Sequence, residues 1–279
     1  MSDGGSRNER GTDSPGEDIV AFQSRLRRLK REGCNLLVVG DVPRELFTRA
    51  SESMVGDADA RRWRVFGLTD ATPESVRDRI PPDDVAPRPR SETTKLVSHS
   101  VGSQRTADTA PTAATADTVF TPGTGTNDAR HETTPTPPAV DVSDGDLTAF
   151  RRELVSAVEE FGARSHRPAE VRLAIDSLGP LFDHYDLEAI REFLRAVGDR
   201  VHARNAMAHY VLPVAYDSDP RRVLADEFDA IVELRTTTER PGDCAAGDDS
   251  SADDSPRLHR PEERWHLPDS DVTMPWVSL

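Results

Sequence analysis

The sequence predicts an α/β protein: a three-layer sandwich with a mainly parallel sheet and a C-terminal antiparallel hairpin. Two observations predict it. Short apolar runs alternate with amphipathic helical segments along most of the chain, which is the pattern of parallel strands joined by crossover helices. The final segment, 264–279, instead contains two short strand-like runs separated by a turn, which is typical of a hairpin at the edge of a sheet.

The elements of the first half are predicted from apolar spacing and from punctuating residues. Gly33 suits the C-cap of the first helix, and Pro43 suits the first turn of the next. Strands are predicted over 36–39, 62–68 and 94–101, and helices over 18–32 and 45–54, with a brief helix in the loop 69–81.

The second half shows the same alternation more strongly. Ser143 or Asp146 can cap a helix whose apolar residues form one stripe. These residues are Leu147, Phe150, Leu154, Val158 and Phe161. Strands are predicted over 171–175, 206–214 and 230–235, helices over 187–205 and 220–229, and hairpin strands over 264–267 and 273–279.

Composition divides the chain into one domain with polar interruptions. Residues 1–17 are polar and Gly-rich and are expected to be disordered. Residues 18–279 are expected to form a single domain with two low-complexity inserts, at about 80–142 and 237–260, where Thr, Pro, Asp and Ala dominate.

The excess of acidic residues is interpreted as an adaptation to a salt-rich solvent and not as a sign of a binding partner. Net charge is −15, the pI is about 5.0, and Lys30 and Lys95 are the only lysines. Such excess acid with arginine as nearly the whole positive charge is similar to the proteins of halophilic archaea, where acidic surfaces keep proteins soluble in salt. The basic run at 25–31 is interpreted as the solvated face of a helix, so direct nucleic-acid binding is not expected.

Cysteines and hydropathy bear on location. Cys34 and Cys244 match no metal or redox spacing, and Cys34 is interpreted as a small buried residue rather than a nucleophile. The N-terminus lacks a signal-peptide core, and no stretch is long and apolar enough to span a bilayer. We therefore expect a reduced, cytoplasmic protein that does not enter a membrane.

The segment "CNLLVVGDVPRELFTRA", 34–50, has the setting of a phosphate loop without its chemistry. A strand, a turn and a helix follow one another, but Gly40 is followed by Asp41 and not by the Gly-Lys-Ser/Thr that grips phosphates and magnesium. Arg44 is the cation on this turn. An acidic residue where phosphates would bind disfavours them by like-charge repulsion.

The segment "RLAIDSL", 172–178, resembles the acidic strand end of RecA-like and KaiC-like ATPases, and the whole chain more closely resembles an uncharacterised haloarchaeal family related to KaiC. This resemblance implies a RecA-like, P-loop NTPase-like fold and no established activity. It also implies a degenerate nucleotide site, comprising Gly40, Asp41, Arg44, Asp176 and Ser177. Asp176 would hold Mg²⁺ only if a nucleotide binds.

Competing interpretations of these residues are structural. Asp176 can cap the helix that starts in "SLGPLF", 177–182, and Ser177 has no identifiable base nearby. Glu74 lies only roughly where such ATPases carry a water-activating carboxylate, and we expect no catalytic role for it. A second group could gather at one end of the sheet but lacks metal-ligand spacing: His184, His202 and His209 with Asp183 and Asp186.

These observations predict a pseudo-ATPase that is not an enzyme. It would be a regulatory or protein-interaction scaffold, in signalling or transcriptional control, with no resident cofactor. A protein partner or a second copy would bind through the terminal hairpin, with Trp265 and Trp276 as anchors. One alternative is a nucleotide-binding switch or weak ATPase that uses Asp176 with an unconventional phosphate loop. Another is a small-anion sensor that uses Arg44 as its clamp.

Overall fold

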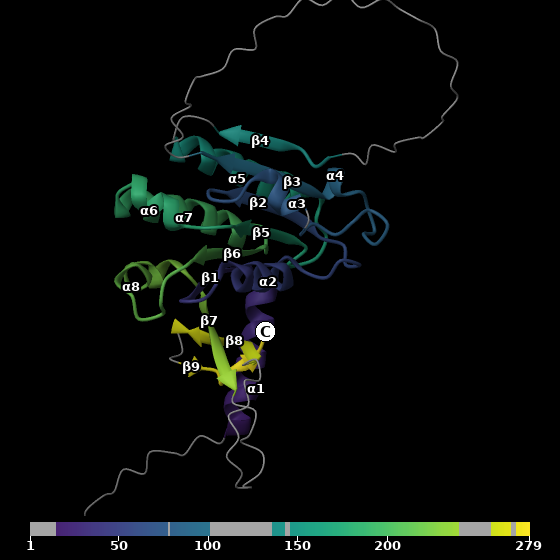
Figure 1. Ribbon diagram of the computed structural model, residues 1–279. Helices are drawn as coiled ribbons and strands as arrows, with labels where there is room; N and C mark the ends of the chain where they lie inside the picture. Colours follow the sequence, from purple (N-terminus) through teal and green to yellow (C-terminus); the bar gives the residue numbers. More distant parts are fainter. Residues whose placement is uncertain (1–14, 78, 101–135, 143–145, 240–257, 269–271) are drawn as a thin grey trace, which may run out of the picture.

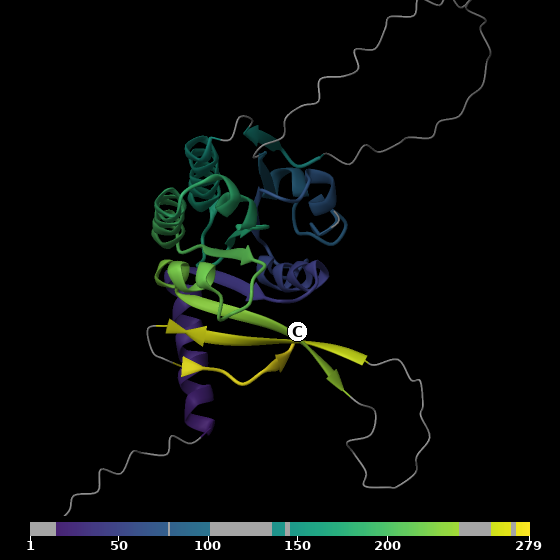
Figure 2. The same cartoon turned by 60° about the vertical axis from the view of Figure 1, so that its left-hand side comes forward.

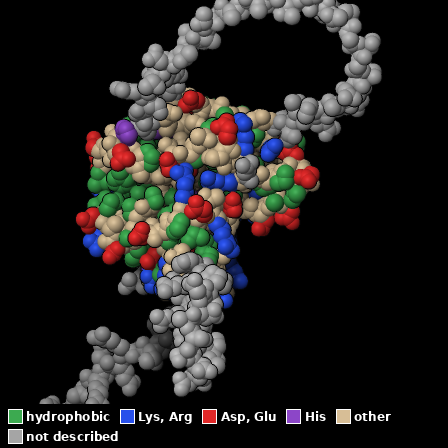
Figure 3. Space-filling view, in the orientation of Figure 1, with side chains coloured by type: hydrophobic (Ala, Val, Ile, Leu, Met, Phe, Trp, Pro, Cys, Tyr) green, Lys and Arg blue, Asp and Glu red, His purple; other side chains and the backbone are tan. Residues whose placement is uncertain are grey.

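A computed structural model describes residues 15–77, 79–100, 136–142, 146–239, 258–268 and 272–279. Its strands form one sheet in the order β10-β8-β7-β1-β6-β5-β2-β3-β4, with β9 paired to β8. Helices cover both faces of the parallel part, and the terminal strands extend the sheet beyond β7 (Figure 1). In the same orientation, Figure 3 shows acidic and basic side chains interspersed over this face of the molecule. Among the described residues, no helix is long and apolar enough to cross a membrane.

The strands from β4 to β7 in this order are all parallel. They are β1 (Cys34–Gly40), β2 (Trp63–Leu68), β3 (Thr94–His99), β4 (Ala139–Val142), β5 (Val171–Ile175), β6 (Met207–Leu212) and β7 (Ala230–Glu239). Every residue of β1, β2, β5 and β6 is buried, because helices cover both faces of the central sheet. The predicted mainly parallel α/β architecture is therefore confirmed.

The helices divide between the two faces. They are α1 (Pro15–Glu32), α2 (Arg44–Val55), α3 (Pro73–Arg77), α4 (Arg90–Thr93), α5 (Leu147–Arg164), α6 (Gly179–His184), α7 (Leu187–Ala203) and α8 (Asp219–Leu224), with a 3₁₀ turn over Ala225–Glu227. On one face, α5 and α7 pack on residues such as Leu37 and Leu173. On the other, α1 and α2 pack on Leu36 and Val38.

Two predicted helix ends are confirmed. Gly33 follows α1 with φ of 87°, in the left-handed region that favours glycine, and a Cβ there would lie 3.0 Å from the backbone oxygens of Ala206 and Val201. Asp146 caps α5 by accepting a hydrogen bond from the Thr148 N–H at 2.8 Å. The alternative cap, Ser143, lies outside the described residues.

The terminal hairpin is confirmed and is longer than predicted. Strand β8 (Leu258–Leu267) runs antiparallel to β7, and β9 (Val272–Thr273) and β10 (Val277–Ser278) both pair antiparallel with β8. Figure 2 shows these strands beside α1, below the helical layers. The predicted second strand, 273–279, is divided in two around Pro275.

The predicted bounds of both inserts were too wide. Within 80–142 the chain forms α4, the predicted strand β3, and β4, which was not predicted. Within 237–260, residues 237–239 pair with 258–260 as the far end of the β7–β8 ladder. The stretches 101–135 and 240–257 lie outside the described residues, as do 1–14 of the predicted disordered N-terminus, whose last residues belong to α1.

Candidate functional site

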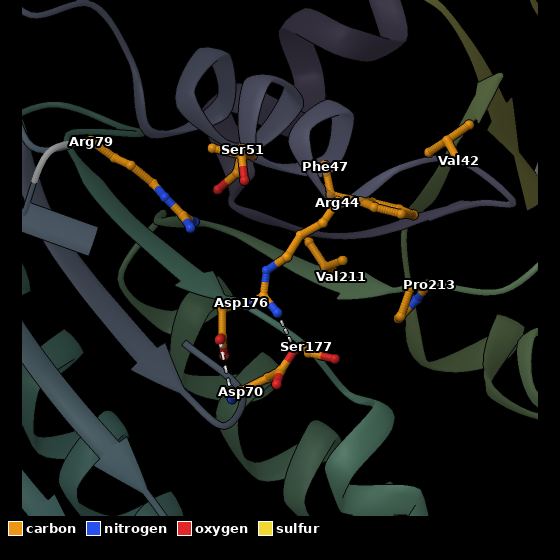
Figure 4. Close-up of a pocket in the computed structure, with 11 residues that line it drawn as sticks. Val42, Arg44, Phe47, Ser51, Asp70, Arg79, Asp176, Ser177, Val211 and Pro213 are labelled. Carbon is orange, nitrogen blue, oxygen red and sulfur yellow. Dashed lines mark hydrogen bonds and ion pairs between the residues drawn. The ribbon is translucent and has the colours of Figure 1, made fainter. Parts of the chain in front are cut away.

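The loops that leave β1, β2, β5 and β6 meet at the carboxyl edge of the sheet, where α/β proteins commonly bind ligands. They enclose a cavity of about 170 Å³ against one side of α2. Figure 4 shows side chains from all four loops and from α2 facing this space. Three of the five predicted site residues, Arg44, Asp176 and Ser177, line the cavity, whereas Gly40 and Asp41 do not.

Gly40 serves close packing of strands. A Cβ at this position would lie 2.7 Å from the Leu234 carbonyl oxygen of β7, a separation that backbone atoms do not tolerate. The Gly40 N–H donates to the Val214 carbonyl at 2.9 Å, so it is already engaged. Asp41 is exposed beside it. The Gly40 N–H, which would be the first donor of a phosphate loop, is therefore not available to a phosphate.

Asp176 braces the loop after β2. Its Oδ1 accepts from the Thr69 N–H at 2.7 Å and from the Thr69 hydroxyl at 3.1 Å, and its Oδ2 accepts from the N–H groups of Asp70, at 3.2 Å, and Ala71. Burial raises the pKa of this carboxyl despite those donors. Both oxygens are thus occupied, and the carboxyl is less readily ionised than a metal ligand should be.

The expectation that Asp176 caps the following helix is wrong. The N-cap position of α6 is Leu178, which has no side-chain cap, and the Gly179 N–H donates instead to the Ser177 hydroxyl at 3.1 Å. Ser177 itself is buried. Asp176 turns toward β2 because β2 and β5 are neighbours in the sheet, a pairing that sequence spacing alone does not reveal.

Arg44, the proposed anion clamp, has a carboxylate partner. Its Nη1 lies 2.6 Å from Asp70 Oδ2, and about half of each side chain is exposed. A pair this exposed contributes little stability, but it neutralises Arg44. Since Asp70 belongs to the loop that Asp176 holds, the ion pair joins α2 to that loop, as the dashed lines in Figure 4 show.

Sequence reasoning missed Ser51 and its contact with His209 behind the cavity. Ser51, on α2, lines the cavity, and its hydroxyl lies 2.7 Å from Nε2 of the buried His209 of β6. Burial, and secondarily the Arg172 guanidinium, lower the pKa of His209 to about 3. Such a weak base does not activate a serine near neutral pH, so the contact fastens α2 to the sheet.

Arg79 is the second residue that sequence reasoning missed. It follows α3, is half-buried and lines the cavity. Figure 4 shows its guanidinium pointing toward the space between Ser51 and Asp176. Within the described part of the chain this guanidinium forms no ion pair or hydrogen bond. No sequence signal separates it from the other arginines, because its direction depends on the loop after α3.

The predicted histidine group is not brought together. His184 is exposed and its Nδ1 lies 2.9 Å from the Pro180 carbonyl, while His202 lies 3.1 Å from Asp229 and His209 faces Ser51. The described residues contain no cluster of three or more metal-ligating side chains. Glu74 is exposed and lies 3.8 Å from Arg77, away from the cavity.

Cys34 has the environment expected of an inert residue. It is fully buried at the start of β1, and burial raises the pKa of its thiol to about 12, so the nucleophilic thiolate does not form near neutral pH. The other cysteine of the sequence, Cys244, lies outside the described residues.

The two hairpin tryptophans have partners within the chain. Trp265 packs edge-on against Phe22 of α1, with ring centroids 6.1 Å apart. Trp276 has two guanidinium groups near its ring: the Cζ atoms of Arg235 and Arg264 lie 3.8 Å and 4.4 Å from the ring centroid. Trp265 is therefore partly buried against the core, and Trp276 is half-buried on the hairpin surface.

The fold and the cavity define the class: an α/β protein with a mainly parallel sheet and, at its carboxyl edge, a crevice lined by both apolar and charged side chains. Residues 33–234, most of the chain and all the strands around the crevice, match a family of unknown function, DUF7504. The chain belongs to this family. No curated protein is significantly similar to it.

Proposed function

We propose that this chain is a non-catalytic regulatory or protein-interaction scaffold built on a degenerate KaiC/RecA-like ATPase fold. One observation carries the proposal. The carboxylate that would hold magnesium, on Asp176, accepts hydrogen bonds from the backbone N–H groups of Thr69, Asp70 and Ala71. A group so engaged supports the architecture of the crevice, and to bind a metal it would first have to release the loop.

Calorimetric titration with ATP and with GTP, each with Mg²⁺ in a high-potassium buffer, tests the proposal. We expect no binding at millimolar nucleotide by the wild type. Asp176→Asn keeps one acceptor oxygen for the loop and removes the charge, so it separates metal binding from folding better than Asp176→Ala does. Nucleotide binding by the wild type that disappears in Asp176→Asn would overturn the scaffold and favour the nucleotide-dependent switch.

A scaffold needs a docking surface, and the hairpin end of the sheet is our candidate. Strand β10 is the last in the sheet order, and Val277 in it is 46% exposed. An edge strand with exposed apolar side chains can pair with a strand of another chain. If a second copy docks there, sedimentation should show a dimer for the wild type and a monomer for Val277→Lys. A wild-type monomer would rule out the second copy.

A small-anion sensor is the second candidate function. The observation that favours it is Arg79, a cation that faces the cavity without a carboxylate partner among the described residues. Arg44, which the sequence suggests as the anion clamp, would then be a residue of the cavity wall whose charge Asp70 neutralises. Neither candidate includes catalysis: the Ser51–His209 contact has too weak a base, and among the described residues that line the cavity the other bases, Asp70 and Asp176, are engaged.

A further inference from the structure

The size of the cavity at the carboxyl edge limits what can bind in it. Its volume is about 170 Å³, close to the roughly 150 Å³ of an apolar cavity that holds benzene and below the roughly 300 Å³ at which pockets for drug-sized ligands begin. A nucleotide, with base, sugar and phosphates, would have to extend out through the open side of the cavity. A ligand of about the size of one substituted ring or short branched chain fills it.

The charges of the wall select the head group of the ligand. Arg44 is neutralised by Asp70, and the Asp176 oxygens are engaged by backbone N–H groups. The guanidinium of Arg79 is the group left without a counter-ion within the described residues. A half-buried guanidinium gains most from a planar carboxylate, which can accept two parallel hydrogen bonds from it.

The remaining wall selects the body of the ligand. Phe47 of α2, Val211 of β6 and Pro213 after β6 contribute apolar surface. Phe47 and Val211 are otherwise buried among core residues. Figure 4 shows Phe47 and Val211 across the cavity from Arg79, so a molecule with an acidic end and an apolar end can meet both. Exposed Arg44 and Asp70 mark where the cavity opens to solvent.

We propose that this cavity binds a small organic acid, whose carboxylate pairs with Arg79 and whose compact apolar body lies against Phe47 and Val211. The acid would be the ligand of the anion sensor, so this step rests on the second proposed function. The organic-acid proposal is independent of the scaffold proposal, because a scaffold without nucleotide chemistry is compatible both with binding an acid and with binding none. Ligand binding would be communicated through α2 and the loop at Asp70, which Arg44 joins.

The test uses benzoate, which has a benzene-sized body and one carboxylate, and benzamide, which has the same shape without the charge. Binding to the full chain is followed by calorimetry and by NMR shifts of residues that line the cavity. We expect millimolar affinity for benzoate, as suits so small a ligand, and at least roughly tenfold weaker binding of benzamide, because a charge-assisted hydrogen bond is lost.

Two arginine variants locate the charge. Arg79→Gln should weaken benzoate binding about tenfold and leave benzamide binding unchanged. Arg77→Gln is the matched control: this neighbour pairs with Glu74 on the surface and does not line the cavity, so benzoate affinity should stay at the wild-type value. Far-ultraviolet circular dichroism confirms that each variant is folded.

The outcomes separate the proposals. Equal affinity for benzoate and benzamide, or equal loss in Arg77→Gln and Arg79→Gln, would overturn recognition of the acid by Arg79. Failure of benzoate to bind would overturn the proposal that the ligand is a small organic acid. Inorganic phosphate and sulfate are titrated in the same buffer: if one binds in an Arg79-dependent way while benzoate does not, the anion sensor survives with a different ligand. If benzoate, phosphate and sulfate all fail to bind, the organic-acid proposal and the anion-sensor proposal both fail. The scaffold proposal does not depend on any of these results.

Discussion

At the residue scale, Asp176 lies directly after β5, and its hydrogen bonds hold the loop after β2. The same loop carries Asp70, which neutralises Arg44. Of the predicted polar groups, Arg44, Asp176 and Ser177 therefore do meet at the cavity while Asp41 does not, and those that meet are mostly engaged with other groups of the chain. Arg79 is the exception, since its guanidinium faces the cavity without a partner within the described residues.

His209 gives the fold an acid-sensitive point. Its pKa in the folded protein is lowered to about 3, from 6.5, so the unfolded chain binds a proton between these values and the folded chain does not. The free energy of unfolding should therefore fall as pH drops below about 6.5, by up to about 1.4 kcal/mol per pH unit. His209→Gln, which keeps a polar partner for Ser51, should remove this part of the pH dependence, as measured by urea unfolding at about pH 7.5 and 5.

His202 provides the contrasting control. Its hydrogen bond with Asp229 raises its pKa, so its contribution to stability is present below the unfolded pKa and is lost as pH rises through the folded value. His202→Gln should therefore change the pH dependence in the opposite sense to His209→Gln. An identical slope in wild type and His209→Gln would show that the buried imidazole does not govern acid sensitivity.

At the element scale, the parts of the fold that follow from local pattern were predictable. A short stretch of sequence is enough to recognise each of three features: Gly33 at the end of α1, the apolar stripe of α5 and the buried strand β5. Strand β4, at the sheet edge, alternates exposed and partly buried residues over only Ala139–Val142 and gives no such signal. The contacts of the site, Asp176 with Thr69 and Ser51 with His209, join residues more than a hundred positions apart, so they depend on strand order, which periodicity does not encode.

The turn after β1 is predicted to need glycine for packing. In Gly40→Ala the new Cβ would lie 2.7 Å from the Leu234 carbonyl oxygen, a backbone atom that can move only if β7 moves. We expect a loss of about 1–3 kcal/mol in the free energy of unfolding, the usual cost of overpacking. Chemical denaturation followed by tryptophan fluorescence measures it.

Gly179→Ala is the comparison for this substitution. Its nearest neighbour would be the Ser177 hydroxyl at 3.3 Å, the end of a side chain that can rotate, and α6 gains an alanine in place of glycine. The change in stability should stay within about 0.5 kcal/mol. Equal stability of Gly40→Ala and wild type would mean that β1 and β7 can move apart at this point to admit a Cβ. The turn after β1 could then also adapt to a ligand.

At the scale of the whole molecule, one sheet unites both sides of the long insert. Strand β1 lies between β6 and β7, and β2 and β3 pair with β5 and β4 respectively. The piece before residue 101 and the piece after residue 135 are thus interleaved in the sheet. Separating them would expose the fully buried faces of β1 and β6, whose apolar residues contribute much of the core.

After one cut inside the insert, the two pieces of the chain should consequently stay associated. With a site for a specific protease placed within 101–135, the two pieces should co-elute in native size-exclusion chromatography and separate only in denaturant, because β1 is held on both edges. A cut placed within 240–257 is the comparison. It leaves the short terminal piece paired with one strand, β7, and packed through Trp265 against Phe22 of α1, so this piece should be released at a lower urea concentration. Separation of the pieces of the first cut without denaturant would mean that the flanks fold as independent units, and the crevice that both sides build would then have to assemble across an interface.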